Sequence, residues 1–313
     1  MTSLLGTLHN TYPESQIDVL VKKENSSLFK KHPFIKNQFV FDKKTNKYKN
    51  LLQLIFQIRE EQYDLVINIQ RFFSSGLISI FSGGKQIRGF KKNPLSLFFS
   101  KRYIHNISKN DNNHEIERNH KLIEDITNLE ISKPRLYPSQ QDYATTSSFK
   151  TQKYICIAPG SLWETKQFPK ERWAKFVSEI NNDTLIYFIG GKAEKSLSDE
   201  IINQSKNSNT INLCGKLSLL QTTALMEHAT MNFSNDSAPL HMASSVNAPI
   251  TAIFCSTVPE FGFGPLSTNS HIIQVKNEMQ CRPCGLHGYR TCPETHFKCG
   301  YEINIQELHK TIQ

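Results

Sequence analysis

Apolar residues in the second half of the chain alternate between two spacings. Short, continuous apolar runs such as Tyr154–Ala158 and Ile250–Phe254 are typical of strands in a buried parallel sheet. Between such runs, apolar residues recur every three or four positions, which predicts helices. We predict strands at 154–158, 184–189, 211–213, 230–234 and 250–254, and helices at 170–180, 193–204, 218–228 and 237–246. This alternation predicts a doubly wound α/β domain.

The first half shows the same alternation more weakly. We predict helices at 4–12 and 51–61 and strands at 17–21, 65–69 and 86–89. Because this half opens with a helix, it looks like a doubly wound domain without its first strand. Prolines and a Ser/Thr cluster in 134–152 predict a linker. The expected domains are therefore 1–150 and 151–313.

Charge is distributed unevenly between these halves. The chain has 313 residues and a formal net charge of +9. Residues 1–150 hold 23 Lys and Arg against 14 Asp and Glu, so the whole excess lies in the first half. This favours an anionic partner, with ordinary solvated lysines as the alternative. No apolar run approaches the ~18 residues of a membrane span, and residues 1–6 do not form a secretory signal, so we expect a cytoplasmic protein.

The loop at 158–169 lies between a predicted strand and a predicted helix. In an open α/β sheet, ligands bind outside the carboxyl ends of the strands. Gly160 allows a turn, Ser161 offers a hydroxyl, and Lys166 can present a cation to a phosphate. The alternative is a surface loop with a chance lysine.

A second loop, at 234–241, also follows a strand and opens a helix. The free N–H groups at a helix N-terminus make an anion site, which would include Asp236, Ser237 and Ala238. His241 lies four residues after Ser237, so both can face one cleft. Alternatively, Asp236 or Ser237 only caps the helix and His241 is a packed side chain.

Four of the seven cysteines, Cys281, Cys284, Cys292 and Cys299, lie in one late segment, 281–299. Four thiolates can bind a structural zinc ion, and free thiols or a packed knuckle are the alternatives. A nucleic-acid-binding zinc knuckle is disfavoured because the basic half lies at the other end of the chain. The sequence has no Asp-x-Asp, which favours neutralising a diphosphate without a divalent metal.

Four motifs together resemble glycosyltransferase family 9, the ADP-heptose:lipopolysaccharide heptosyltransferases. They are the loop at 158–169, the Asn235–His241 run, the Phe-Gly-Phe-Gly-Pro turn at 261–265 and the cysteine segment 281–299. The resemblance implies a GT-B fold, in which two Rossmann-like domains face each other. It also implies an inverting, metal-independent transfer of heptose from ADP-heptose to the inner core of lipid A, an anionic glycolipid acceptor. The enzyme would need no cofactor, bind no nucleic acid and act at the inner face of the cytoplasmic membrane.

The resemblance assigns roles to particular residues. Ser161 and Lys166 should contact the donor diphosphate. Asp236, Ser237 and Ala238 should hold the phosphates and the sugar, with His241 behind them. The family's acidic ribose-binding residue has its nearest counterpart in Asn212, which departs from the pattern.

A further departure concerns the first strand and its Gly-Asp loop, whose Asp the family uses as general base. This chain aligns only after that loop, so the resemblance implies a base upstream of Met1 and leaves the catalytic residue unknown. Two alternatives stay open: a family-9 transferase that uses another sugar nucleotide or glycan acceptor, and an inactive truncated homologue.

Overall fold

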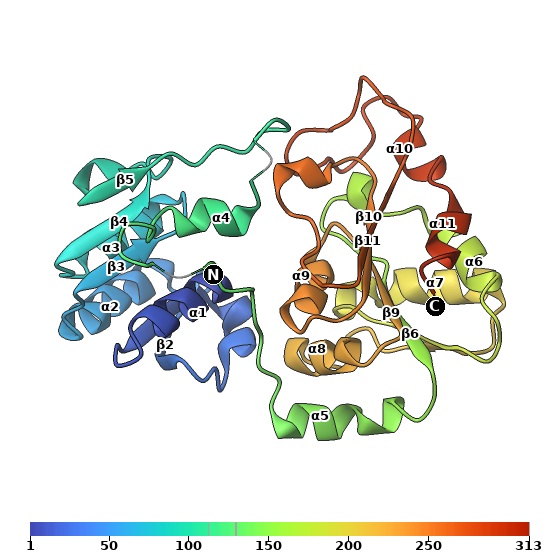
Figure 1. Ribbon diagram of the computed structural model, residues 1–313, viewed down its shortest axis with the longest axis horizontal. Coiled ribbons are helices and arrows are strands. Elements are labelled where there is room, and N and C mark those ends of the chain that lie inside the picture. The colour runs from blue at the N-terminus through green and yellow to red at the C-terminus, as the bar shows by residue number, and fades with distance from the viewer. Residues whose placement is uncertain (112, 129, 313) are drawn as a thin grey trace. The chain divides into compact units, whose positions relative to one another are not determined.

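A computed structural model describes residues 1–111, 113–128 and 130–312 of the chain. The chain divides into two compact units, Met1–Pro134 (unit 1) and Arg135–Gln313 (unit 2), and each packs helices against parallel strands (Figure 1). The sequence had placed this division at residue 150.

Unit 1 contains the strands that the sequence predicted near residues 17, 65 and 86, so these predictions are confirmed. Its helices are α1 (Thr2–Thr11), α2 (Lys47–Glu60), α3 (Phe73–Phe81) and α4 (Glu115–His120), with 3-10 helices η1 (Lys23–Phe29) and η2 (Ser96–Phe98). Its strands are β1 (Ile17–Lys22), β2 (Ile35–Phe41), β3 (Leu65–Asn68), β4 (Gln86–Phe90) and β5 (Lys101–Tyr103). They form two parallel sheets, β1–β2 and β3–β4–β5.

Unit 2 contains one larger sheet. Its strands are β6 (Tyr154–Ala158), β7 (Leu185–Phe188), β8 (Thr210–Asn212), β9 (Met231–Asn235), β10 (Ile250–Phe254) and β11 (Ser270–Gln274). Its helices are α5 (Gln140–Thr146), α6 (Lys170–Ser178), α7 (Lys195–Ser205), α8 (Leu219–Glu227), α9 (Ala238–Ser245), α10 (Lys298–Tyr301) and α11 (Ile305–His309), with 3-10 helices η3 (Ser147–Phe149), η4 (Glu164–Lys166), η5 (Lys192–Glu194) and η6 (Pro259–Phe261). The predicted strands and helices of this half are confirmed.

The sheet of unit 2 is parallel throughout and follows the order β11-β10-β9-β6-β7-β8. From β6 the chain moves outward through β7 and β8, then returns and moves outward the other way through β9, β10 and β11. The direction therefore reverses between β6 and β9. In open α/β sheets, ligands bind at this reversal, outside the carboxyl ends of the two strands. The loops that follow β6 and β9 are the two that the sequence selected.

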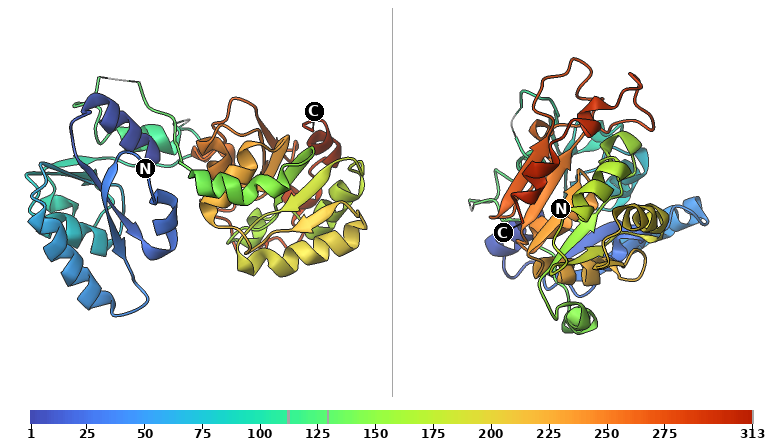
Figure 2. Two further views of the ribbon diagram at one scale, coloured as in Figure 1. Left: turned by 90° about the horizontal axis from the view of Figure 1, so that it is seen from below. Right: turned by 90° about the vertical axis from the view of Figure 1, so that its right-hand side faces the viewer.

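Helices cover both faces of this sheet (Figure 2). Helix α6 starts after Pro169, a residue tolerated at a helix start, and buries Trp173, Phe176 and Val177 on one stripe. Phe168 in the preceding loop meets the Trp173 ring edge-on, at 5.2 Å between centroids. This packing fixes the end of the β6–α6 loop against the core.

Residues 135–150, where the sequence predicted a linker, belong to unit 2. Helix α5 packs on α8, and the Tyr143 hydroxyl donates a hydrogen bond to Glu227 Oε2 at 2.5 Å. The Tyr187 hydroxyl of β7 donates to the Phe149 carbonyl at 2.9 Å. These contacts attach the segment to the domain that follows it.

Candidate functional site

An ion pair joins the two loops at the sheet reversal. Lys166 Nζ lies 2.6 Å from Asp236 Oδ2, and these side chains are only 15% and 10% exposed. The Thr257 hydroxyl, after β10, donates to the same carboxylate oxygen at 2.7 Å. Lys166 and Asp236 were predicted from separate motifs, and the structure places them in direct contact.

Asn235, the last residue of β9, holds the β6–α6 loop in place by hydrogen bonds. Its side-chain oxygen accepts a hydrogen bond from the Phe168 N–H at 2.9 Å, and its Nδ2 donates to the Pro159 carbonyl at 2.7 Å. Asn235 is fully buried, so these partners replace the water that a polar side chain requires. It was not among the predicted site residues. The signal in the sequence was its place as the first residue of the Asn235–His241 motif, at the end of an apolar strand.

Helix α9 begins at the same place with its N-terminus uncapped by a side chain. Ser237 is the N-cap residue but makes no capping hydrogen bond. Its hydroxyl lies 3.3 Å from the Ser234 hydroxyl instead. The Asp236 N–H donates to the Ile253 carbonyl, so the amides that open the helix are those of Ser237 and Ala238. An uncapped helix start beside a lysine favours an anion.

The remaining predicted donor residues lie on the same two loops. Ser161 is half-buried, and its carbonyl accepts a hydrogen bond from Gln167 Nε2 at 2.8 Å, which closes the β6–α6 loop on itself. His241 is exposed one turn after Ser237 on α9. Their roles toward a donor stay predictions.

Glu194 is a carboxylate near these loops that the sequence analysis missed. It follows β7, and its side chain lies against Gly160 and Gly191, where a Cβ on either glycine would contact it. Asn212, the predicted counterpart of a ribose-binding acid, is engaged elsewhere: its Nδ2 donates to Asp199 Oδ1 at 2.7 Å and to the Lys195 carbonyl at 3.0 Å. Glu194 is therefore the carboxylate that lies beside the β6–α6 loop, whereas Asn212 is held by α7.

The cysteine segment 281–299 is anchored to the carboxyl end of β10. Arg282 donates to the carbonyls of Cys255 at 2.7 Å and Thr257 at 2.8 Å, and the Cys284 N–H donates to the Ser256 carbonyl at 2.8 Å. Burial lowers the pKa of Arg282. These bonds hold the strand end that carries the hydroxyl partner of Asp236.

The same segment also contacts the loop of Lys166. The Thr165 N–H donates to the Tyr289 carbonyl at 3.1 Å, and the Tyr289 N–H donates to Thr165 Oγ1 at 2.8 Å. Gly288 has a φ of +75°, and a Cβ there would lie 2.8 Å from Thr165 Oγ1. A glycine is thus required for this close approach. The cysteine segment supports the residue directly before Lys166.

The four clustered thiols differ in exposure. Cys281 and Cys292 are half-buried, whereas Cys284 and Cys299 are buried. Burial raises the pKa of Cys299 to about 12, and the neighbouring thiolate of Cys284 adds to this rise. Among the described residues, no group of three or more His, Cys, Asp or Glu side chains is placed to hold a metal ion. The predicted zinc ligands therefore do not form a coordination set in this conformation.

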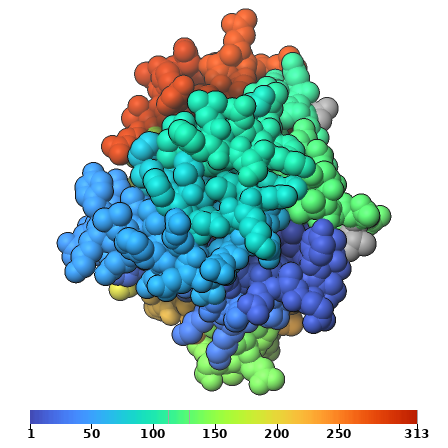
Figure 3. All heavy atoms as spheres, turned by 90° about the vertical axis from the view of Figure 1, so that its left-hand side faces the viewer, coloured from blue at the N-terminus to red at the C-terminus, as the bar shows by residue number. Residues whose placement is uncertain are grey.

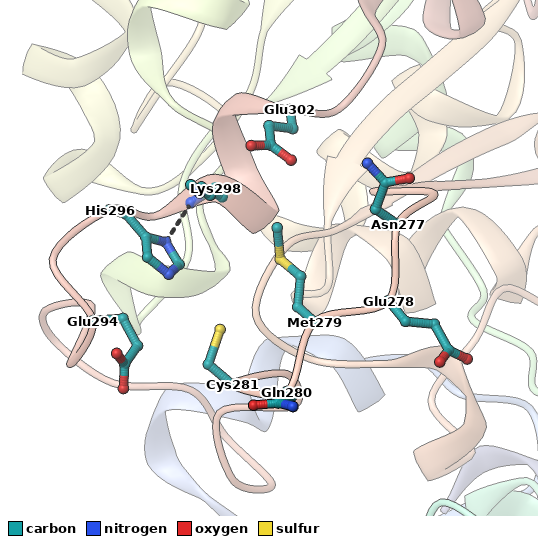
Figure 4. Close-up of a pocket in the computed structure, with 9 residues that line it drawn as sticks. All are labelled: Asn277, Glu278, Met279, Gln280, Cys281, Glu294, His296, Lys298 and Glu302. Atoms are coloured by element: carbon teal, nitrogen blue, oxygen red, sulfur yellow. Dashed lines mark hydrogen bonds between the residues drawn. The ribbon is translucent and has the colours of Figure 1, made fainter.

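One side of the cysteine segment lines an open pocket of about 720 Å³ (Figure 4). Its walls are mostly polar and include three glutamates, and they comprise Asn277, Glu278, Met279, Gln280, Cys281, Glu294, His296, Lys298 and Glu302. The Lys298 N–H donates to His296 Nδ1 at 3.0 Å at its rim. None of the residues that line it belongs to the loops of the ion pair.

With its parallel strands and a candidate anion site at the sheet reversal, unit 2 has the features of a Rossmann-like domain. A model of glycosyltransferase family 9 (heptosyltransferase) matches residues 51–291. The chain therefore belongs to glycosyltransferase family 9 and is a glycosyltransferase.

Individual relatives agree with this assignment. Lipopolysaccharide heptosyltransferase 3 of Escherichia coli K12 is 23% identical over 274 residues, which cover 82% of this chain and 78% of that protein. Lipooligosaccharide heptosyltransferase 2 of Campylobacter jejuni is 24% identical over 310 residues, covering 97% and 90%.

Solved structures share the fold. The glycosyl transferase family 9 structure from Veillonella parvula matches with a TM-score of 0.85 at 19% identity, covering 99% of this chain and 91% of that one. The structure of E. coli ADP-heptose lps heptosyltransferase II matches with a TM-score of 0.77 at 20% identity, covering 99% and 93%. The predicted GT-B class, with two Rossmann-like domains, is confirmed. In the described part of the chain, no helix has the length and apolarity to cross a membrane.

Proposed function

We propose that this chain transfers a heptose from ADP-heptose to the inner core of lipopolysaccharide, with unit 2 binding the donor and unit 1 the acceptor. The names of its relatives support the sugar and the acceptor class. The observation that carries the donor assignment is the Lys166–Asp236 pair beside the uncapped start of α9. A cation and a helix N-terminus at a sheet reversal suit a nucleoside diphosphate.

In this proposal the bound diphosphate replaces Asp236 as the ion-pair partner of Lys166. As the bond to the sugar breaks, negative charge builds on the departing ADP, and Lys166 with the amides of Ser237 and Ala238 stabilises it. Glu194 accepts hydrogen bonds from the ribose hydroxyls. Ser161 and His241 line the phosphate and sugar positions. No metal ion takes part in the transfer, which proceeds with inversion at the anomeric carbon.

The cysteine segment has a structural role in this proposal. It holds the donor loops through Arg282 and Tyr289, whether or not the four thiols bind zinc. Metal analysis of the purified protein separates these cases: about one equivalent of zinc supports a thiolate site, and less than about 0.2 equivalents in folded protein rejects it.

The acceptor is proposed to be an anionic glycolipid at the inner face of the cytoplasmic membrane. The positive charge of residues 1–150 supports this, because polybasic surfaces bind anionic membranes. The alternative is a family-9 transferase that uses another sugar nucleotide or another glycan acceptor, which predicts a different donor or acceptor preference.

The test is calorimetric titration with ADP, UDP and ADP-heptose, followed by a transfer assay with lipid A–Kdo acceptor in EDTA. We expect ADP and ADP-heptose to bind, UDP to bind more weakly, and the anomeric configuration of the product to be inverted. Tighter binding of UDP would contradict the proposed donor, and transfer that stops in EDTA would contradict metal independence.

A further inference from the structure

Three cations converge on one aromatic ring in unit 1. Lys22 Nζ, Lys43 Nζ and Arg71 Cζ lie 5.6, 5.3 and 5.8 Å from the centroid of the Phe72 ring. Lys22 ends β1, Lys43 follows β2, and Arg71 follows β3. The cluster therefore lies at the carboxyl ends of parallel strands, the edge where α/β domains bind ligands.

Among the described residues, none of these three cations forms a salt bridge with a carboxylate. The nearby acids are paired with other lysines: Asp42 with Lys23 at 2.8 Å and Glu24 with Lys44 at 3.1 Å. Burial, with the positive charge of Lys22 and Lys47, lowers the pKa of Lys43. Glu24 is a through-space counter-charge to Lys22 and Lys43, but it is shared with its ion-pair partner Lys44. The remaining excess of positive charge favours a bound anion.

A helix terminus adds to the same positive field. Helix α3 starts directly after Phe72, its N-cap residue, and no side chain caps it. The aromatic surface is open: Phe72 is 43% exposed and Phe73 is 55% exposed. The segment between β4 and β5, teal in Figure 3, adds exposed Leu97 and Phe98 to the surface of unit 1. Cations next to exposed aromatic rings suit a ligand that is both anionic and partly apolar.

We propose that Lys22, Lys43 and Arg71, with Phe72 and the start of α3, bind the phosphate of a phosphorylated saccharide. The cations and helix amides hold the phosphate, and the Phe72 ring packs against the C–H face of the sugar. This deepens the proposed function, on which it rests, by naming the acceptor group that unit 1 recognises. The phosphate can belong to a glycolipid or to a soluble sugar phosphate.

The test compares Lys43→Gln, Arg71→Gln and Phe72→Leu with a charge-matched control, Lys85→Gln. Lys85 is exposed, pairs with Asp64 at 2.7 Å and precedes β4, so it lies at the amino ends of the strands. Calorimetry with glucose 1-phosphate and inorganic phosphate measures the soluble arm. Sedimentation with phosphatidylcholine vesicles, with or without diphosphorylated lipid A, measures the lipid arm.

We expect Lys43→Gln and Arg71→Gln each to weaken glucose 1-phosphate binding about tenfold and Lys85→Gln to change it less than twofold. Phe72→Leu should weaken binding of the sugar phosphate more than that of inorganic phosphate. If the wild type binds lipid A vesicles but neither glucose 1-phosphate nor inorganic phosphate, and the variants lose the vesicle binding, the phosphate belongs to a glycolipid. Equal weakening by Lys85→Gln, or no weakening by the other two charge variants in both arms, overturns the proposal.

ADP titration separates this proposal from the donor assignment. All four variants should bind ADP as the wild type does, because the changes lie in unit 1. If the charge variants lose phosphate binding but the wild type does not bind ADP-heptose, the phosphate site is supported and the proposed reaction is rejected. Transfer with an unchanged acceptor KM in Lys43→Gln and Arg71→Gln would reject this site alone.

Discussion

Replacing Lys166 by alanine removes the cation that neutralises a nearly buried carboxylate. Asp236 keeps its hydrogen bond from Thr257 but loses its ion pair at 2.6 Å. Breaking a fully buried pair costs about 3–5 kcal/mol, and the 10% exposure of Asp236 favours the lower end of that range. We expect Lys166→Ala to lower the free energy of unfolding of unit 2 by about 3 kcal/mol.

The partner variant should behave differently. In Asp236→Asn the amide can still accept from Thr257, and the long stem of Lys166 can carry its charge to water, so we expect a cost of about 1 kcal/mol. The double variant lacks the unpaired charge and should cost about 2 kcal/mol. The double-mutant cycle then gives a coupling energy between Lys166 and Asp236 of about 2 kcal/mol.

ADP binding separates stability from donor recognition. Lys166→Ala removes a charge-assisted contact and leaves a carboxylate near the diphosphate, so the Kd for ADP should rise about 30- to 100-fold. Asp236→Asn should change it less than about threefold, because Lys166 remains.

Urea unfolding and calorimetry supply the measurements, with Lys170→Ala as control. Lys170 forms a surface pair with Glu200 at 2.7 Å, and such pairs contribute less than about 1 kcal/mol. Additivity of Lys166→Ala and Asp236→Asn within about 0.5 kcal/mol, or an unchanged Kd for ADP in Lys166→Ala, would refute this reasoning.

Three further outcomes are expected. Asn235→Ala leaves the Phe168 N–H and the Pro159 carbonyl without their partner and should cost about 3 kcal/mol in urea unfolding; a cost below about 1 kcal/mol would contradict the bridging role. Burial lowers the pKa of His32 to about 4, so folding disfavours its protonated form, and stability should fall as the pH drops from about 6.5 toward 4. His32→Asn keeps an acceptor for the Phe34 N–H and should show a smaller loss between thermal melts at pH 7 and pH 5, whereas an equal loss would exclude His32 as the source. Iodoacetamide should modify the half-buried Cys281 and Cys292 first, and peptide mapping that finds Cys255 modified early in folded protein would contradict its complete burial.

Much of unit 2 could be predicted from the sequence, because its strands are continuous apolar runs with clear ends. β6 and β10 have the predicted bounds. β2 and β11 were missed because they are partly exposed: Lys36, Asn37 and Gln38 interrupt the apolar pattern of β2. In its pattern of apolar and polar residues, a polar edge strand cannot be distinguished from a loop.

Only those parts of the candidate site that lie in local motifs could be predicted from the sequence. The loops of Lys166 and Asp236 follow strands and carry recognisable chemistry, so each could be selected separately. Their pairing depends on which strands become neighbours, and Asn235 and Glu194 act through contacts with distant backbone. The support from Arg282 and Tyr289 is likewise a long-range contact that local spacing does not encode.

Gly288 of the cysteine segment packs so closely against Thr165 of the β6–α6 loop that no space remains for a side chain at position 288. Any side chain at 288 would displace the hydroxyl that accepts from the Tyr289 N–H. In evolutionary terms the two positions are expected to change together: a lineage that acquires alanine or serine at 288 needs a smaller residue at 165 and a different way to hold its donor loop. The cysteine segment and the β6–α6 loop should therefore diverge as one inherited block, and chimeras that exchange only one of them are expected to bind ADP more weakly.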